Sequence, residues 1–484
     1  MERTLPKALH PEGLTPDPKD LAAGRYGTFE MIRIWGPERT FDCLLRVQSQ
    51  AAVTLSRLHP DIVPPEHATE IAEKANLHYV NPQRIRDLEK KTGHDIIAVN
   101  TALEEVVSRE AAAHINKAKT SADTTQPARA LQLRASLEVV IDSVENLRDI
   151  VIEKALAWKD IPHMDQTHLY DALPTVVGRP FAHYAEMLQS NLEILRFACE
   201  HSIIGKWSDA TGNHHSARAL GIDGIALEEA YCKDLGLGHM VAAAQLPGLE
   251  FEADIVYALA RTGETLSNLA EYVAMGRGDD RNIFINGSPK KKKGSSAMPH
   301  KDAKNGNPTT EEQVESVRNK MRGWMTTALS NCRMPYARNL AASANSRIDF
   351  EDGFKFLDHG IRNLAETVYW LDVQEEVAAS RVERSYGVVT AQQLMTYLTD
   401  YRKVKDPLPR SEAHDLTARL ATEAWKSKAQ FVNIVLLEPA ITSRMDEATI
   451  RQITNPLQYV GESKRIIELV AEKYYQKKTR DIVL

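Results

Sequence analysis

The stretch richest in residues that can do chemistry runs from Gly294 to Lys301 and reads G-S-S-A-M-P-H-K. Two adjacent hydroxyls, Ser295 and Ser296, follow a glycine, and the prolines in and after the stretch predict a loop. A loop of this composition can present a hydroxyl and free backbone N–H groups to an anion. Lysines occupy positions 290–293, so composition alone favours a solvated basic linker.

The order of residues in this loop resembles the signature of the fumarase/aspartase superfamily, G-S-S-x-M-P-x-K-x-N-P. Residues 294–301 match it without a gap, and His300 in the variable slot is most similar to the adenylosuccinate lyase branch. The chain departs from the pattern after Lys301, because residues 302–306 stand where the family has a single residue before Asn-Pro. How this longer segment affects loop closure is left open by the sequence.

The resemblance implies roles for the loop residues. Ser295 would be the base, and Lys301 with the loop N–H groups would stabilise its alkoxide, since a serine hydroxyl is otherwise a poor base. The remaining loop residues implied to contact the substrate are Ser296, Met298 and Asn307.

A histidine further upstream is the candidate general acid. Thr167-His168 is followed by Val177-Gly178 at the spacing that the family uses, and histidine suits proton transfer because its pKa lies near working pH. The chain has 16 histidines, so a structural role is the usual expectation for any one of them. The family's Gln-Pro after this Thr-His is replaced by Tyr170-Asp171. Glu312, four residues after Pro308, is implied to pair with His168 and fix its tautomer.

Three short patterns are candidate binding elements near the N-terminal third. Arg25-Tyr26, followed by Glu-Met, resembles the element that holds the nucleotide phosphate, although an Arg-Tyr pair alone also fits a surface ion pair. The pair His94-Asp95 would place a histidine against substrate at a helix N-terminus, where Asp95 also serves as an ordinary cap. Thr120-Ser121, in a T-S-x-D turn, could bind a carboxylate or simply cap the next helix.

The last candidates lie in the second half of the chain. Gln245 stands where the family has a glutamine for the dicarboxylate end, but the arginine expected four residues later is Leu249. One anion contact is therefore missing or comes from elsewhere. A stretch of the form R-x-x-x-x-S-x-x-x-R offers two guanidiniums and a hydroxyl that suit a phosphate. Its residues are Arg338, Ser343 and Arg347.

Long amphipathic helices are predicted to carry these residues. Apolar side chains between Leu133 and Ala155 recur at alternating steps of four and three, which makes a near-heptad seam. Similar patterns run over 179–202, 249–275 and 309–329. The seams favour a bundle that also supports oligomerisation, although a monomeric bundle could bury them internally.

The predicted organisation is mostly α-helical, with three domains and a central long-helix bundle. The expected boundaries are 1–118 for an N-terminal helical domain, 119–362 for the bundle with the signature loop at 277–308, and 363–484 for a C-terminal helical domain. We see no internal repeat and no strand-rich segment. The first 23 residues contain four prolines and no apolar run, so neither a signal peptide nor a membrane span is expected there.

The composition of the chain excludes some classes of binding partner. Hydrophobic residues make up 43% and charged residues 26% of the 484, as in an ordinary globular protein, and the net charge of −6 gives no pull toward nucleic acid. Four scattered cysteines lack metal-ligand spacing and fit reduced thiols of a cytoplasmic protein. We expect no nucleic-acid or membrane partner.

The resemblance implies a homotetramer whose active sites are shared between subunits. The implied reaction is β-elimination of fumarate from adenylosuccinate and from the succinylated aminoimidazole carboxamide ribotide, with no metal or organic cofactor. Another fumarate-releasing C–N lyase, such as argininosuccinate lyase or aspartase, is the alternative, and the phosphate-binding elements argue against it. A catalytically silent helical scaffold of the same ancestry is a further alternative.

Overall fold

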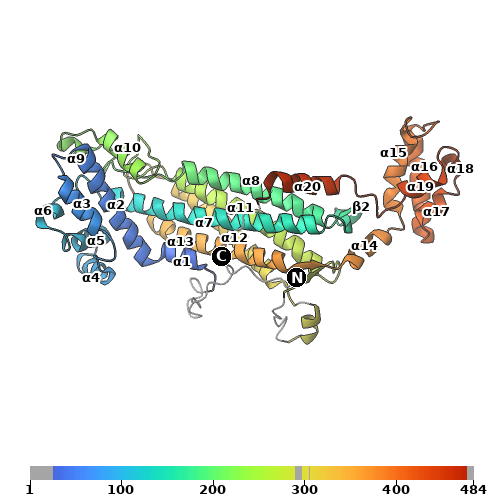
Figure 1. The fold of residues 1–484 in the computed structure, drawn as a ribbon, viewed down its shortest axis with the longest axis horizontal. Coiled ribbons are helices and arrows are strands. Elements are labelled where there is room, and N and C mark those ends of the chain that lie inside the picture. The colour runs from blue at the N-terminus through green and yellow to red at the C-terminus, as the bar shows by residue number, and fades with distance from the viewer. Residues whose placement is uncertain (1–24, 289–296, 305, 477–484) are drawn as a thin grey trace.

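The computed structural model describes residues 25–288, 297–304 and 306–476, and these residues are overwhelmingly helical. The molecule is an elongated bundle with a smaller group of helices at each end (Figure 1). At the N-terminal end the structure has α1 (Phe29–Trp35), α2 (Pro37–Leu58), α3 (Pro65–Lys74), α4 (Pro82–Thr92), α5 (Asp95–Glu104) and α6 (Arg109–Ala112). The short helices α9 (His215–Ala219) and α10 (Gly224–Asp234) lie at the same end.

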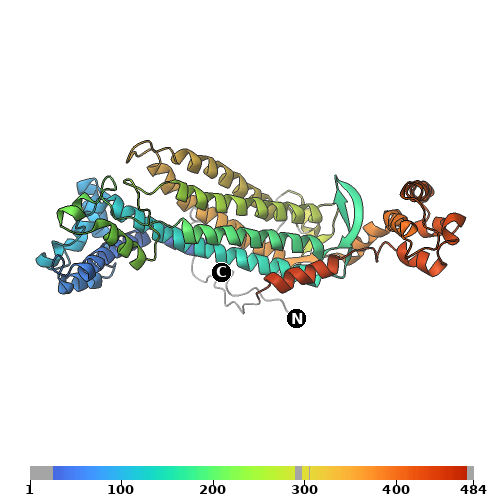
Figure 2. The same ribbon diagram turned by 90° about the horizontal axis from the view of Figure 1, so that it is seen from above.

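Five long helices form the body of the bundle. They are α7 (Ala122–Ala157), α8 (Gly178–His201), α11 (Glu250–Arg277), α12 (Thr309–Asn331) and α13 (Ser343–Trp370). Seen from above, they run side by side along the long axis (Figure 2). Their seams are buried as the sequence pattern predicts: Leu137, Val140, Val144, Leu147 and Val151 of α7 are each 0% exposed. Burial of these apolar faces is the main force that holds the bundle together.

The predicted start of α7 was wrong by eleven residues. The helix begins at Ala122 rather than near Leu133 and includes Pro127. Pro127 is the sixth residue of the helix and lies beyond the first turn, so it removes one backbone hydrogen bond, the one to the carbonyl of Asp123. The consequence is that the T-S-x-D turn abuts the helix directly.

One short hairpin and one antiparallel pair of strands far apart in the sequence interrupt the helices, and the sequence did not predict them. Strand β1 (Pro162–Thr167) pairs antiparallel with β2 (Tyr170–Val176), and β3 (Phe284–Asn286) pairs with β4 (Leu371–Val373). Gly178 follows β2 where α8 meets the end of α7, and a Cβ there would lie 2.1 Å from the carbonyl oxygen of Ala155. The glycine of the Val-Gly step is therefore required by this close approach.

The C-terminal helices build a second hydrophobic core, separate from that of the bundle. The structure has α14 (Glu375–Glu383), η3 (Val388–Thr390), α15 (Ala391–Thr399), α16 (Arg410–Ser427), α17 (Phe431–Val435), α18 (Pro439–Thr442), α19 (Glu447–Ile453) and α20 (Ser463–Tyr474). Helices α15 to α19 surround the second core at the far end of the molecule (Figure 1). Helix α20 instead returns to the bundle, where Ile467 and Val470 join the main core.

The predicted domain boundary between 362 and 363 falls inside α13, which continues to Trp370. The division into three domains stays a prediction. Within the described part of the chain, none of the helices is both long enough and apolar enough to traverse a lipid bilayer.

Candidate active site

The largest group of predicted site residues gathers at the end of the bundle that carries the N-terminal helices. His94 is the residue before α5 and Ser121 is the residue before α7. The Oγ of Ser121 lies 3.4 Å from Nε2 of His94, and Nδ1 of His94 lies 3.3 Å from Oδ1 of Asp95. Two helix N-termini thus present a hydroxyl and an imidazole side by side, where the helix dipoles favour an anion.

The T-S-x-D turn is held by its aspartate rather than by its hydroxyls. Asp123 is 0% exposed, forms an ion pair with the buried Lys206, and accepts backbone N–H bonds from Thr120 at 2.8 Å and Ser208 at 3.0 Å. A carboxylate buried at this depth is tolerable only because all these donors face it. The turn is therefore rigid, and the hydroxyl of Ser121 is left to face His94.

The second part of this group comes from α13 and the segment before it. Arg347, in the first turns of α13, lies 3.6 Å from Asp95, which joins it to the histidine end of the group. The backbone N–H of Gln245 donates to the carbonyl of Ala337 at 3.1 Å, next to Arg338. Ser343 is the first residue of α13. The structure therefore brings together the predicted residues His94, Asp95, Thr120, Ser121, Gln245, Arg338, Ser343 and Arg347.

The surroundings of Arg338 contain little compensating negative charge. Its guanidinium is half-buried, and within the described residues it has neither an ion pair nor a side-chain hydrogen bond. Burial, together with the nearby positive charges of Arg129 and Arg347, lowers the pKa of Arg338, and the carboxylate of Glu252 opposes this effect. A cation in these surroundings is stabilised by an incoming anion.

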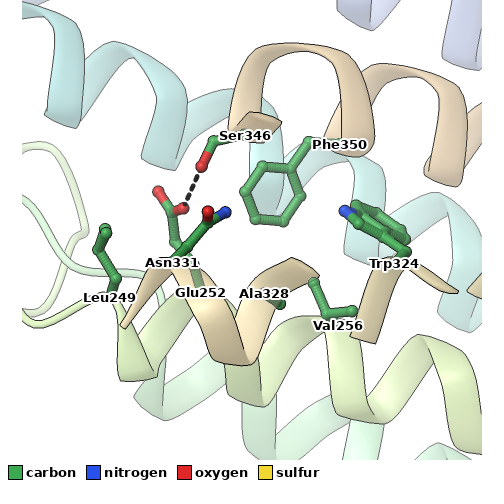
Figure 3. A pocket seen from close by; sticks show the side chains of 8 residues that line it. All are labelled: Leu249, Glu252, Val256, Trp324, Ala328, Asn331, Ser346 and Phe350. Atoms are coloured by element: carbon green, nitrogen blue, oxygen red, sulfur yellow. Dashed lines mark hydrogen bonds between the residues drawn. The ribbon is translucent and has the colours of Figure 1, made fainter. Parts of the chain in front are cut away.

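Two residues of this neighbourhood were missed by the sequence reasoning. Arg129 of α7 forms an ion pair with Glu252 of α11 at 3.1 Å, and the other oxygen of Glu252 accepts from Ser346 at 2.9 Å. Figure 3 shows this last bond beside Leu249, at a crevice with room for about one water molecule. The available signal was the arginine missing at Leu249, which leaves an anion contact to be supplied from elsewhere in the chain.

The described part of the signature forms a compact turn around its lysine. The 3₁₀ helix η2 (Pro299–Lys304) follows Met298, and Gly306 N–H donates back to the carbonyl of Lys301 at 2.8 Å. This closure brings the amide oxygen of Asn307 within 2.8 Å of Lys301 Nζ. The additional residues therefore leave the lysine and the Asn-Pro pair adjacent. Ser295 and Ser296 lie outside the described residues.

Glu312 and Tyr26 lie in this same region of the bundle. Glu312 is exposed on the first turn of α12, which begins immediately after the signature. Tyr26 packs its ring edge against Phe356 and His359 of α13, and Thr310 of α12 lines the same crevice. Arg25 is exposed beside it. Position 359 is twelve residues beyond Arg347, or about 18 Å along α13, so one chain does not bring Tyr26 and Arg347 together.

His168 stands apart at the exposed tip of the β1–β2 hairpin. It forms the two-residue turn with Leu169, and both have positive φ, 55° and 68°. Such a turn matches the twist of a hairpin, but it usually holds Asn or Gly because larger residues are strained there. Among the described residues, no hydrogen bond joins His168 to Glu312 within one chain. Ser121 and His168 lie beyond opposite ends of α7, whose 36 residues span about 54 Å.

Comparison with known proteins places these features in a family. A family model described as "Lyase" matches residues 29–323, and one described as "Adenylosuccinate lyase C-terminus" matches residues 387–470. The first match alone covers more than half of the chain. The chain belongs to this lyase family. The family resemblance predicted from the signature is thereby confirmed, as is the mostly helical fumarase-like fold.

Curated relatives of the lyase match along nearly its whole length. The adenylosuccinate lyase of Methanocaldococcus jannaschii is 28% identical over 455 residues, covering 94% of this chain and 96% of the relative. That of Bacillus subtilis is 29% identical over 430 residues, covering 88% and 94%. Both carry the same name although one organism is an archaeon and the other a bacterium.

Solved structures share the fold of the lyase at low sequence identity. A fumarate lyase from Mesorhizobium sp. BNC1 superposes with a TM-score of 0.78 at 19% identity, covering 93% of this chain and 98% of that one. A β-carboxy-cis,cis-muconate cycloisomerase from Acinetobacter calcoaceticus gives 0.79 at 17%, covering 94% and 100%. At these identities the likeness is one of fold.

Proposed function

We propose that the lyase cleaves adenylosuccinate to AMP and fumarate, and cleaves the succinylated aminoimidazole carboxamide ribotide in the same way. The observation that carries this proposal is the pair of family matches, which together extend over residues 29–323 and 387–470 and include the adenylosuccinate lyase C-terminus. Both reactions break a C–N bond and belong to purine nucleotide biosynthesis. The proposed location is the cytoplasm, and the substrate is a nucleotide rather than a nucleic acid.

The geometry at the N-terminal end of the bundle supports a nucleotide substrate. Arg338 has no anionic partner among the described residues, and Arg347 shares only a 3.6 Å contact with Asp95. Guanidiniums left unsatisfied in this way suit phosphate oxygens, which they can bind two at a time. Argininosuccinate and aspartate carry no phosphate, so the alternative C–N lyase activities do not explain the positive charge of Arg338 and Arg347.

The proposed chemistry is a β-elimination with balanced proton transfers. The alkoxide of Ser295 takes the proton from Cβ of the succinyl group, and the electron pair moves toward the neighbouring carboxylate to give an aci-carboxylate. The C–N bond then breaks as His168 donates a proton to the leaving nitrogen, which yields fumarate and the amine. In this proposal Lys301, whose Nζ donates to the amide oxygen of Asn307 at 2.8 Å, stabilises the negative charge of the base.

The remaining residues have binding roles in this proposal. Thr120, Ser121 and Gln245 hold the dicarboxylate, with His94 beside them on its helix N-terminus. Ser296 and Met298 contact the substrate from the signature. Phosphate contacts come from Arg338, Ser343 and Arg347 of one subunit and from Arg25 and Tyr26 of another. Glu312 orients the imidazole of His168. None of these proposed steps requires a metal or an organic cofactor.

This assignment requires more than one copy of the chain at each site. Ser121 and His168 lie about 54 Å apart along α7, which is far longer than a nucleotide. We therefore propose a homotetramer in which the His168 hairpin of one subunit reaches the Ser121 end of another. The exposed side chains Leu169 and Tyr170, 81% and 80% accessible in the single chain, would be covered by that contact.

The test is an ultraviolet assay of the purified protein with adenylosuccinate, run beside argininosuccinate and aspartate. We expect turnover of adenylosuccinate alone. Cleavage of argininosuccinate or aspartate without cleavage of adenylosuccinate would contradict the proposed function and assign the protein to another branch of the family. Absence of all three activities from a folded protein would favour the silent scaffold.

A further inference from the structure

The site contains an arginine that the family pattern does not assign. Arg129 of α7 lies about two turns beyond Ser121, on the helix that begins at the T-S-x-D turn. Its side chain is 22% exposed, and within the described residues its only side-chain hydrogen bond goes to Glu252. One side of the guanidinium is thus fixed, while its remaining N–H groups have no acceptor in the part of the chain that the structure describes.

The charges around Arg129 do not balance. Arg129 and Arg347 are both close enough to Arg338 to affect its ionisation, and Glu252 is the one carboxylate that acts against them there. Of these three arginines, only Arg347 contacts Asp95, at 3.6 Å. Among the described residues, the carboxylates that contact or oppose these three guanidiniums are Glu252 and Asp95, so positive charge exceeds negative charge within this group. Such an excess is costly at a half-buried position unless an anion completes the site.

The excess positive charge lies near the position where this sequence departs from the family pattern. Leu249 stands where the family pattern has an arginine, is 5% exposed, and lines the same crevice as Glu252 and Ser346 (Figure 3). A leucine has no hydrogen-bond donor to offer an anion. Glu252 lies one turn farther along α11 and holds the guanidinium of Arg129 at this place. Helix α7 thus supplies a cation where α11 has lost one.

We propose that Arg129 binds the nucleotide phosphate together with Arg338 and Arg347, as the substitute for the arginine absent at position 249. Glu252 acts as a positioning residue, because its second oxygen is fixed by the buried Ser346 and it therefore holds Arg129 in one orientation. The phosphate, rather than the dicarboxylate, is the expected partner because the cationic neighbours of Arg129 are Arg338 and Arg347. This inference rests on the proposed function for the identity of the nucleotide.

The plain competing explanation is a structural ion pair between α7 and α11. The two explanations differ in ligand binding, so the experiment measures AMP affinity by calorimetry on the full-length protein. Arg129→Leu removes the charge and Arg129→Lys keeps it while losing the planar fork. The double variant Arg129→Leu/Glu252→Gln removes both charges and so avoids leaving Glu252 unpaired and buried. The matched control is Arg134→Leu, because Arg134 lies on the same helix and its one side-chain hydrogen bond among the described residues goes to the Gly236 carbonyl.

We expect the Leu variant and the double variant to bind AMP about ten- to a hundredfold more weakly, and Lys to be intermediate. Adenosine, which has no phosphate, is measured in parallel and should bind all variants equally. Unchanged AMP affinity in the double variant overturns the proposal, as does an equal loss for AMP and adenosine. Selective loss of AMP affinity in a protein that does not cleave adenylosuccinate would support this inference and defeat the proposed function, so the two failures are distinguishable.

Discussion

Arg381 of α14 donates to Asp171 of β2 at 3.2 Å, across 210 positions of sequence. The same carboxylate accepts from the side chain of Gln166 at 2.8 Å, and Gln166 in turn accepts from Arg281 at 2.5 Å. These contacts tie both strands of the hairpin to the rest of the chain just below His168. The Tyr-Asp departure from the family pattern therefore supplies a different anchor for His168, the proposed general acid.

The first prediction concerns this anchor. Asp171→Asn should lower kcat about ten- to a hundredfold, because displacement of a catalytic group by about 1 Å has that effect. Unfolding temperature should change little, since Asp171 is 42% exposed and exposed ion pairs stabilise weakly. The charge-exchanged double variant Asp171→Arg/Arg381→Asp should recover part of the rate. Asp160→Asn, which breaks an exposed pair with Lys464, is the control and should leave kcat unaltered. Equal rates for Asp171→Asn and Asp160→Asn would contradict the anchoring role.

The second prediction concerns the phosphate contacts. Arg338→Ala and Arg347→Ala should raise KM more than they lower kcat, because the phosphate does not react and is bound similarly in ground and transition states. Arg25→Ala should behave alike. Arg84→Ala removes an exposed arginine that pairs with Glu105 away from the site, and steady-state kinetics of this control should match the wild type. A fall in kcat at unchanged KM would instead place these arginines at the reacting atoms.

The third prediction identifies the base. Ser295→Ala should reduce turnover by about three orders of magnitude or more, since the Cβ proton is then left without an acceptor. Ser296→Ala should have a much smaller effect, on binding. Stopped-flow measurement of AMP formation distinguishes them, with circular dichroism as the check on folding. If the larger loss occurs in Ser296→Ala, the base is Ser296, and if both variants remain active the elimination mechanism must be abandoned.

The fourth prediction uses a buried histidine of β1. Burial lowers the pKa of His163 to about 4, and its side chain is 3% exposed. The unfolded chain therefore takes up a proton near pH 6.5 that the folded chain refuses until about pH 4. The associated stability is complete above pH 6.5 and is lost as the pH falls from 6.5 toward 4, by an amount on the order of 3 kcal/mol.

Urea unfolding of wild type and His163→Leu at pH 7.5, 6, 5 and 4.5 measures this contribution. The difference in unfolding free energy between the two proteins should shift in favour of the variant as the pH falls. Taking the difference cancels the carboxylates that titrate in both proteins. A constant difference across the series would show that His163 keeps an ordinary pKa in the folded protein.

The helices of the bundle could be predicted closely from sequence because their burial is periodic. The predicted range 179–202 became Gly178–His201, and 309–329 became Thr309–Asn331. The β1–β2 hairpin could not be predicted from sequence, because its strands are short. Its turn, His168-Leu169, also lacks the Asn-Gly that usually signals such a turn. The turn conformation is imposed by pairing on both sides and not by the turn residues.

The residues of the candidate site also fall into those that the sequence predicts and those that it does not. Motif order led to His94, Ser121 and Arg347, and the structure places these near one another. Arg129 belongs to no motif, and its relevance depends on how α7 packs against α11, which periodicity does not specify. The separation of Ser121 from His168 follows from the true start of α7, which the apolar seam alone placed eleven residues too late.

The last prediction tests whether Ser121 and His168 act at one site from different subunits. His168→Ala and Ser121→Ala should each be nearly inactive as pure proteins. When the two are dissociated, mixed equally and reassembled, about a quarter of the sites should carry neither lesion, given closed symmetry and random assortment. Activity should therefore recover to about a quarter of the wild-type value. Reassembled wild-type protein is the control for losses on refolding, and subunit exchange is verified by mass spectrometry of tagged chains. A site built within one chain offers no route to recovery, so an exchanged mixture that stays as inactive as its parents would refute the shared site.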